Sequence, residues 1–390
     1  MLSTFHNRYA TLPNTAATRY SPFMSNASIG WQGTEVLQPS PSSFTIKNLY
    51  VTLTGAVGGT MVHVLTLRKN GVDTGLTITT DASGTVFTDA VNSVSVVAGD
   101  SPSWSLVTSG SGGSSVFIRI GFEMEGTGSF MTTGGVTTLS AGADRYIPIQ
   151  AGIPSTTVGN AETLIPTGGT ISNAYAVLGG TPGVGRSYTT TLVKNGVDTA
   201  LTVTIADTNT TGNDTSNSVS VVAGDKIYWK IVPAGSPSAR MIGIGIRWTP
   251  TIDGEYIHTG VSTAPSASAA QYVSAGNSVF GSINQRGGSA PTSDYTIKNL
   301  YVDLDSAPAS GKSLAFAMMS NGSATSVTTT ISDTATSGND TSNSGATVAG
   351  GLVELRSTPS GTPTVSITRF AWVQYQAPVS SQNSNFFFFF

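Results

Sequence analysis

The side chains that could support acid–base or metal chemistry are few and scattered along the chain. Three histidines are present, at His6, His63 and His258, and there is no cysteine. His63 lies between two valines in a strand-like segment, which favours a structural role, and no third ligand accompanies His6 and His258 to complete a zinc site. Without cysteine, disulfides and thiolate chemistry are excluded. The sequence therefore predicts no metal site, no cofactor and no catalytic histidine.

Two aspartate-bearing loops could supply oxygen ligands to calcium. Asn-Asp-Thr occurs at 213–215 and again at 339–341, with Asp207 and Asp333 nearby. Calcium takes about six to eight oxygens, and each loop offers two carboxylates. An aspartate that caps a turn by accepting backbone N–H groups accounts for the same pattern. We favour the turn interpretation and keep calcium as the alternative.

Glycoside hydrolysis needs two carboxyl groups that face each other across a sugar. The glutamates available for such a pair belong to no repeated motif: Glu35, Glu123, Glu125, Glu162 and Glu255. No nucleophile elbow, phosphate-binding loop or His-Glu-x-x-His motif occurs in the sequence. We therefore predict that the protein is not an enzyme. Trp31 stands alone in its loop and is the candidate ligand contact, with a buried loop anchor as the competing interpretation.

Charge is scarce throughout the chain. Charged residues make up 10% of the 390 residues, against about 25% in an average soluble protein. The net charge is −3 and no run of Lys or Arg occurs, which argues against nucleic acid as a partner. No apolar stretch reaches the roughly 18 residues of a membrane span, and the first ten residues lack a secretory signal pattern. Low charge suits surfaces that pack against other protein surfaces.

The elements that carry these residues repeat three times. Lys-Asn-Gly-Val-Asp-Thr occurs at 69–74 and 194–199, and a fainter version begins at 320. Asn70, Asn195 and Asn321 are 125 and 126 residues apart, a period that is a whole domain rather than a solenoid unit of about 20–50 residues. We predict three tandem domains followed by a linker and poly-Phe tail, with these bounds: 1–128, 129–253, 254–377 (divergent) and 378–390.

Each predicted domain consists of short strands joined by turns. Asn195-Gly196 favours a two-residue hairpin turn, and Leu201, Val203 and Ile205 alternate with threonines at the period of a half-buried strand. The polar segment 206–217 is predicted as turn rather than strand. No helical periodicity is present. The fold class is therefore all-β, with three tandem antiparallel β-sandwiches, jelly-roll-like rather than immunoglobulin-like.

Two positions in these strands are predicted to pack tightly. Trp104 and Trp229 recur at equivalent places and are expected to anchor the cores. In the closing strand 241–248, Gly243 and Gly245 alternate with isoleucines, which predicts that a neighbouring surface approaches the glycine side closely.

The chain ends in five consecutive aromatic residues: Phe386, Phe387, Phe388, Phe389 and Phe390. Buried rings of this kind would contribute on the order of 2 kcal/mol each to a contact. We consider them a candidate docking segment for a neighbouring subunit, with no functional role as the alternative.

The repeated string, Lys-Asn-Gly-Val-Asp-Thr, Leu-Thr-Val-Thr-Ile, then Asn-Ser-Val-Ser-Val-Val-Ala-Gly-Asp and an aromatic strand, resembles the tandem jelly-roll domains of virion proteins from tailed bacteriophages. The similarity covers the first two copies well and the third partly, and the matching positions are hairpin and turn residues, so no site residue follows from it. It implies a non-enzymatic virion protein, assembled in the host cytoplasm as a homo-oligomer such as a trimer. Its partners would be its own copies and other virion proteins, and decoration or reinforcement of the capsid is the preferred role.

Two alternatives stay open on the sequence. One is a tail or fibre adhesin that binds a receptor or a host-surface glycan. The other is a structural protein of the cell surface or of an extracellular filament.

Overall fold

The computed structural model describes residues 2–23, 31–35, 37–126, 129–134, 138–150, 154–274, 279–282, 294–348 and 352–377. For residues 2–11, 119, 129, 130, 132 and 134 it describes only the backbone. Within these ranges the fold is built of β-strands, and one short 3-10 turn, η1 (Val158–Asn160), is the helical element. The predicted all-β class of antiparallel sandwiches is confirmed.

Eight strands form the sandwich of repeat 1. They are β1 (Leu2–Thr11), β2 (Ala17–Pro22), β3 (Phe44–Leu53), β4 (Val62–Lys69), β5 (Val72–Thr79), β6 (Val86–Val96), β7 (Pro102–Ser109) and β8 (Phe117–Gly126). One sheet has the order β1-β8-β3-β6 and the other β2-β7-β4-β5. The chain is thus a long hairpin, in which the first strand pairs with the eighth and the second with the seventh, rolled into two sheets. That is the jelly-roll topology.

Repeats 2 and 3 have the same topology. Repeat 2 contains β9 (Ser129–Gly134), β10 (Arg145–Ile147), β11 (Thr163–Leu164), β12 (Gly169–Leu178), β13 (Gly183–Lys194), β14 (Val197–Asp207), β15 (Thr211–Val221), β16 (Lys226–Ala234) and β17 (Ile242–Pro250). Repeat 3 contains β18 (Glu255–Ser262), β19 (Gln271–Val273), β20 (Tyr295–Leu304), β21 (Ala309–Ser320), β22 (Ser323–Asp333), β23 (Ser337–Thr347), β24 (Val353–Ser360) and β25 (Thr368–Tyr375). Their sheets are β9-β17-β12-β15 with β10-β16-β13-β14, and β18-β25-β20-β23 with β19-β24-β21-β22. β11 is an addition that pairs with β16.

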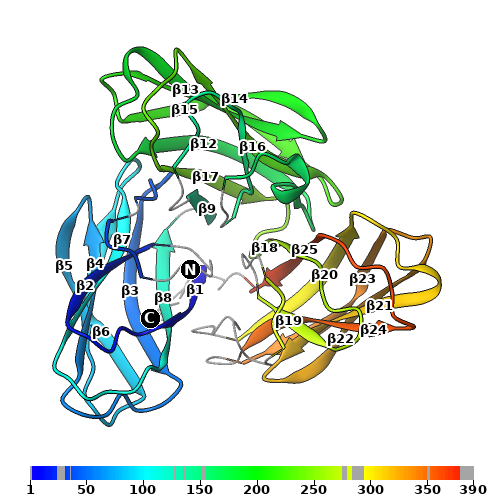
Figure 1. The fold of residues 1–390 in the computed structure, drawn as a ribbon, viewed down its shortest axis with the longest axis horizontal. Helices are drawn as coiled ribbons and strands as arrows, with labels where there is room; N and C mark the ends of the chain where they lie inside the picture. The colour runs from blue at the N-terminus through cyan, green and yellow to red at the C-terminus, as the bar shows by residue number, and fades with distance from the viewer. Residues whose placement is uncertain are drawn as a thin grey trace, which may run out of the picture.

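The three sandwiches sit at the corners of a triangle (Figure 1). Strands β1, β9 and β18, each at the edge of its sheet, lie nearest the centre. Each sandwich has its own cluster of buried apolar side chains, in which Trp104, Trp229 and Trp372 are almost fully enclosed. The predicted core role of Trp104 and Trp229 is confirmed. One molecule thus carries three similar lobes about a common centre.

The repeated Lys-Asn-Gly and Gly-Asp motifs hold the hairpin to a neighbouring turn. Asn195 and Gly196 have φ values of 50° and 80°, as the predicted hairpin turn requires. The side-chain amide nitrogen of Asn195 donates to Asp225 Oδ1 (2.7 Å), and its side-chain oxygen Oδ1 accepts from the backbone N–H of Lys226 (2.8 Å). Asn70 makes the same two contacts in repeat 1, at 2.7 and 2.8 Å. The motif shared between repeats is therefore a structural connection.

Asp214 joins the edge strands of the two sheets in repeat 2. Its carboxylate accepts from the backbone N–H of Thr202 in β14 (3.0 Å), from those of Ser216 and Asn217 (3.1 Å each), and from the Asn217 amide (2.9 Å). Burial alone would raise the pKa of Asp214, but these hydrogen bonds outweigh it and hold the pKa below its usual value. The same arrangement recurs at Asp89 and Asp340.

This contact corrects the prediction that 206–217 is turn. β14 continues to Asp207 and β15 starts at Thr211, so most of the segment is strand. The Thr/Asn/Asp composition suggests a turn, but the segment can form a strand because Asp214 lies at a break in the β12–β15 register. There its side chain accepts hydrogen bonds from the nearby backbone N–H groups.

Replacing Asp214 with alanine is expected to lower the free energy of unfolding by about 2 kcal/mol, because three partly buried backbone N–H groups lose their acceptor. Urea denaturation monitored by circular dichroism measures the change. Asp198→Ala is the matched control: Asp198 contacts Lys230 with a side chain that is 54% exposed, so its loss should cost no more than about 0.5 kcal/mol. Equal effects of the two substitutions would contradict the bridging role.

Candidate functional site at the seams between repeats

Trp31, the candidate ligand contact, is partly buried and packs against the core cluster of repeat 1. That placement supports the interpretation as a loop anchor. Ligand binding by Trp31 stays a prediction. The candidate docking segment Phe386–Phe390 lies outside the described residues.

The two histidines whose side chains are described lie in different repeats. His63 is buried in repeat 1, where its Nδ1 contacts Thr108 Oγ1 (3.0 Å), and burial lowers its pKa. His258 is buried in repeat 3, stacked on Trp372, with Nε2 2.8 Å from Gln374 Oε1. Only the backbone of His6 is described, in β1. Across the described ranges, no group of three or more His, Asp or Glu residues could hold a metal ion.

The aspartates considered for calcium binding are engaged by N–H donors. Beyond the Asp214 contacts above, Asp207 Oδ1 accepts the backbone N–H of Gly185 (2.7 Å) and Asp333 Oδ1 that of Gly311 (2.7 Å). Each caps a separate turn with φ near +58° at the aspartate itself. These contacts support the turn interpretation.

The glutamates considered for glycoside hydrolysis are spread over the repeats, each beside its own partner. Glu35 accepts from Arg68 Nε (3.0 Å) and from Ser103. Asn48 donates to Glu123 (2.7 Å), and Lys47 pairs with Glu125 (2.7 Å) near the surface. Glu162 and Glu255 both lie where repeat 2 meets repeat 3.

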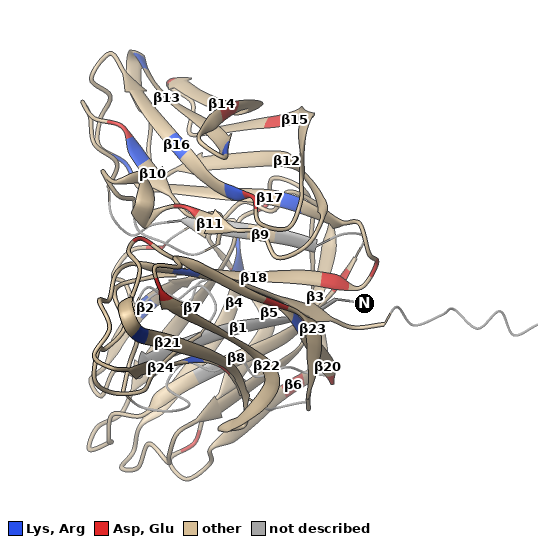
Figure 2. Cartoon of the chain, turned by 90° about the vertical axis from the view of Figure 1, so that its right-hand side faces the viewer, with Lys and Arg blue, Asp and Glu red and all other residues tan. Residues whose placement is uncertain are grey.

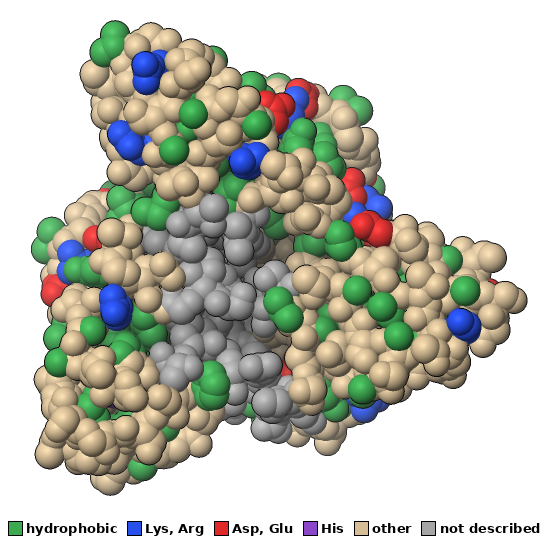
Figure 3. All heavy atoms as spheres, in the orientation of Figure 1, with side chains coloured by type: hydrophobic (Ala, Val, Ile, Leu, Met, Phe, Trp, Pro, Cys, Tyr) green, Lys and Arg blue, Asp and Glu red, His purple; other side chains and the backbone are tan. Residues whose placement is uncertain are grey.

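A cluster of five charged residues sits at this boundary, which we name the charged seam. Arg369 of β25 contacts Asp303 Oδ2 (2.9 Å), Asp305 Oδ1 (2.6 Å) and, across the boundary, Glu162 Oε2 (3.2 Å). Lys226 of repeat 2 reaches Asp303 Oδ2 (2.8 Å) from the other side. The Arg369 side chain is only 4% exposed. Figure 2 shows that charged residues are sparse along the ribbon as a whole. In Figure 3, red and blue side chains gather where the upper and right-hand lobes meet.

Further contacts of several kinds extend the charged seam. Thr167 of repeat 2 donates to Glu255 Oε2 (2.6 Å), a fully buried carboxylate that also pairs with Lys298 (2.7 Å). Gln150 donates to the Ile257 carbonyl (3.0 Å) and accepts from the Thr259 N–H (2.9 Å), both in β18. Ile257 itself belongs to the apolar cluster of repeat 2. Repeats 2 and 3 are therefore joined by ion pairs, hydrogen bonds and apolar packing together.

The boundary between repeats 1 and 2, which we name the neutral seam, is built differently. A Cβ atom on Gly243 would lie 2.0 Å from the carbonyl oxygen of Leu37, and one on Gly245 would lie 1.9 Å from that of Pro39. The prediction that a neighbouring surface approaches these glycines is confirmed, and the neighbour is the backbone of repeat 1. Only glycine allows this approach.

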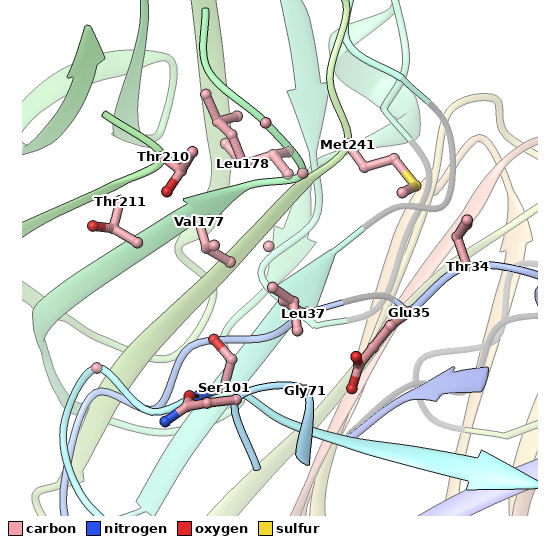
Figure 4. Close-up of a pocket in the computed structure, with 16 residues that line it drawn as sticks. Thr34, Glu35, Leu37, Gly71, Ser101, Val177, Leu178, Thr210, Thr211 and Met241 are labelled. Carbon is pink, nitrogen blue, oxygen red and sulfur yellow. Dashed lines mark hydrogen bonds between the residues drawn. The ribbon is translucent and has the colours of Figure 1, made fainter. Parts of the chain in front are cut away.

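A groove of about 590 Å³ opens beside this contact (Figure 4). Repeat 1 contributes Leu37 and Ser101, and repeat 2 contributes Val177, Leu178 and Met241. Glu35 also lines the groove, and the cations Arg68 and Lys69 are not among the lining residues. The neutral seam is thus less completely filled than a protein interior.

Sequence reasoning did not identify the charged seam. Its members lie up to about 200 residues apart, and nothing in the repeat pattern states which domain faces which. The sequence nonetheless contains a signal for it. Only 10% of the residues are charged, and the positions that form the charged seam are uncharged in the preceding repeat.

No protein-family model matches the chain, and no curated protein sequence matches it. Within the described residues, no helix has both the length and the apolarity that crossing a membrane requires.

Proposed function

We propose that the chain is a non-enzymatic structural protein of a tailed-bacteriophage virion, which decorates or reinforces the capsid surface. The observation that carries the proposal is the arrangement of three jelly rolls about one centre within a single chain. Jelly rolls recur in viral capsid proteins, and a three-lobed molecule suits sites of local threefold symmetry on a shell. The fold thus adds to the sequence resemblance.

The chemistry of the described residues agrees with a structural role. The carboxylates singled out from the sequence, together with His63 and His258, serve as caps, ion-pair partners and core groups. Partners on the particle would be other virion proteins and further copies of the chain. A homotrimer is not needed to bring three sandwiches together, because one chain supplies all three.

The test is fractionation of a phage lysate that produces this chain. Particles are banded in a caesium chloride gradient, probed with an antibody against the chain and examined by immunogold electron microscopy, with an uninfected lysate as control. We expect the chain to band with particles and the gold to mark heads. Gold confined to tails would favour the adhesin instead, and gold on cell-surface filaments would favour the third candidate; either result would overturn the decoration role.

A further inference from the structure

The hydrogen-bond and strand registers identify which positions of the two seams are equivalent. Val177 of β12 and Asp303 of β20 each lie two residues after the tyrosine that the two strands share. Their cross-strand partners are Gly243 and Arg369, so these two residues occupy equivalent positions. The backbone N–H groups of Ser101 and Lys226 both donate to the turn asparagine of their own repeat. Ser40 and Ile165 are equivalent because their backbone N–H groups donate to the backbone carbonyls of Asp100 and Asp225. Leu37 and Glu162 each lie three residues before them and are therefore equivalent too.

All five charged positions of the charged seam are therefore uncharged at the neutral seam. The two charged residues that repeat 2 contributes, Lys226 and Glu162, correspond to Ser101 and Leu37 of repeat 1. The three that repeat 3 contributes, Arg369, Asp303 and Asp305, correspond to Gly243, Val177 and Gly179 of repeat 2. The groove in Figure 4 occupies the place that these long side chains fill at the charged seam. At the third boundary, the equivalents of Lys226, Asp303 and Asp305 are uncharged as well (Leu352, Thr52 and Thr54), whereas the equivalent of Arg369 is Arg119.

From this asymmetry we infer that repeats 2 and 3 move as one rigid body and that the molecule opens at the neutral seam, where repeat 1 separates from repeat 2. This conformational device goes beyond the proposed function and does not depend on it.

Two physical arguments support the direction of opening. Separating repeats 2 and 3 breaks the Arg369–Glu162 and Lys226–Asp303 ion pairs and the hydrogen bonds of Gln150 to β18, and it takes Ile257 out of the apolar cluster of repeat 2. Separating repeats 1 and 2 breaks a backbone contact over two glycines, and the groove beside that contact already admits water. Dispersion contacts are already missing there. The lower opening free energy therefore belongs to the neutral seam.

Amide hydrogen exchange of the full chain tests the inference, because the two seams contain equivalent amides with equivalent hydrogen bonds. Ser40 N–H donates to Asp100 O (2.7 Å) and Gly99 N–H to Ser40 O (2.7 Å); the counterparts are Ile165 to Asp225 (2.9 Å) and Gly224 to Ile165 (2.8 Å). We expect the protection factors of the Ser40 and Gly99 amides, which correct for intrinsic exchange rates, to be about tenfold lower than those of Ile165 and Gly224. Equal protection, or faster exchange in the second pair, would overturn the inference.

Gly243→Ala gives an independent check, since the new methyl group meets the Leu37 backbone rather than a flexible side chain. Exchange should rise further at Ser40 and Gly99 and stay unchanged at Ile165 and Gly224. Gly142→Ala is the matched control, because a Cβ there has nothing within 4 Å. An equal increase at both seams would contradict opening at one of them.

Discussion

Arg369→Met is expected to lower the free energy of unfolding by about 3–5 kcal/mol, because it removes one partner from a buried ion cluster. The guanidinium contacts three carboxylates and also donates to the Gly159 carbonyl (3.1 Å). Without it, the one cation among the described residues that still pairs with Asp303 and Glu162, whose side chains are 12% and 21% exposed, is Lys226. Urea denaturation at fixed ionic strength, followed by circular dichroism, measures the loss.

Two further variants separate this effect from general damage. Arg145→Met removes a guanidinium that donates to the adjacent Asp144 carbonyl at the surface, and should change stability by no more than about 0.5 kcal/mol. Adding Glu162→Gln and Asp303→Asn to Arg369→Met should recover part of the loss, since neutral groups no longer need the cation. A loss below about 0.5 kcal/mol for Arg369→Met alone would show that the cluster does not join the repeats.

Acid is expected to destabilise the protein through His258 well before carboxylates titrate. Burial lowers the pKa of His258 to about 4, an effect that outweighs the hydrogen bond with Gln374, whereas an unfolded histidine titrates near 6.5. Between these values the unfolded state binds a proton that the folded state does not, so stability falls as pH drops from about 6.5 towards 4. The full effect is on the order of 3 kcal/mol.

Comparison with His258→Phe isolates this contribution. Phenylalanine keeps an aromatic ring against Trp372 and Tyr256, whose centroids lie 5.4 and 5.1 Å from that of His258, but cannot take up a proton. Unfolding midpoints in urea between pH 7.5 and 4.5 should fall more steeply for the natural protein than for the variant. Parallel slopes would mean that His258 is accessible to protons in the folded state.

Local features of the fold could be predicted from sequence because local chemistry determines them. The Asn195-Gly196 hairpin and the core position of Trp229 follow from φ preferences and two-residue periodicity, and both are confirmed. The error at 206–217 arose because composition alone does not distinguish a turn from an edge strand whose N–H groups are satisfied by an aspartate on the strand itself.

The seams could be predicted only in part. Alternating glycines indicated a close neighbour for Gly243, but its identity depends on how three domains pack, which no local pattern encodes. The charged seam joins Glu162 to Arg369 and Lys226 to Asp303, and each of these residues has an unremarkable environment in the linear sequence. Aligning the repeats shows charge in one copy alone at Lys226, Asp303 and Asp305, and this pattern would have indicated the charged seam.

A single chain places three jelly rolls at the corners of a triangle. Small-angle X-ray scattering in line with size-exclusion chromatography and light scattering tests it most directly. We expect a single species with a mass near 39.9 kDa and a scattering curve that fits the triangle of Figure 1. An extended string of three separate lobes, or a triangle that appears only at three times that mass, would contradict it.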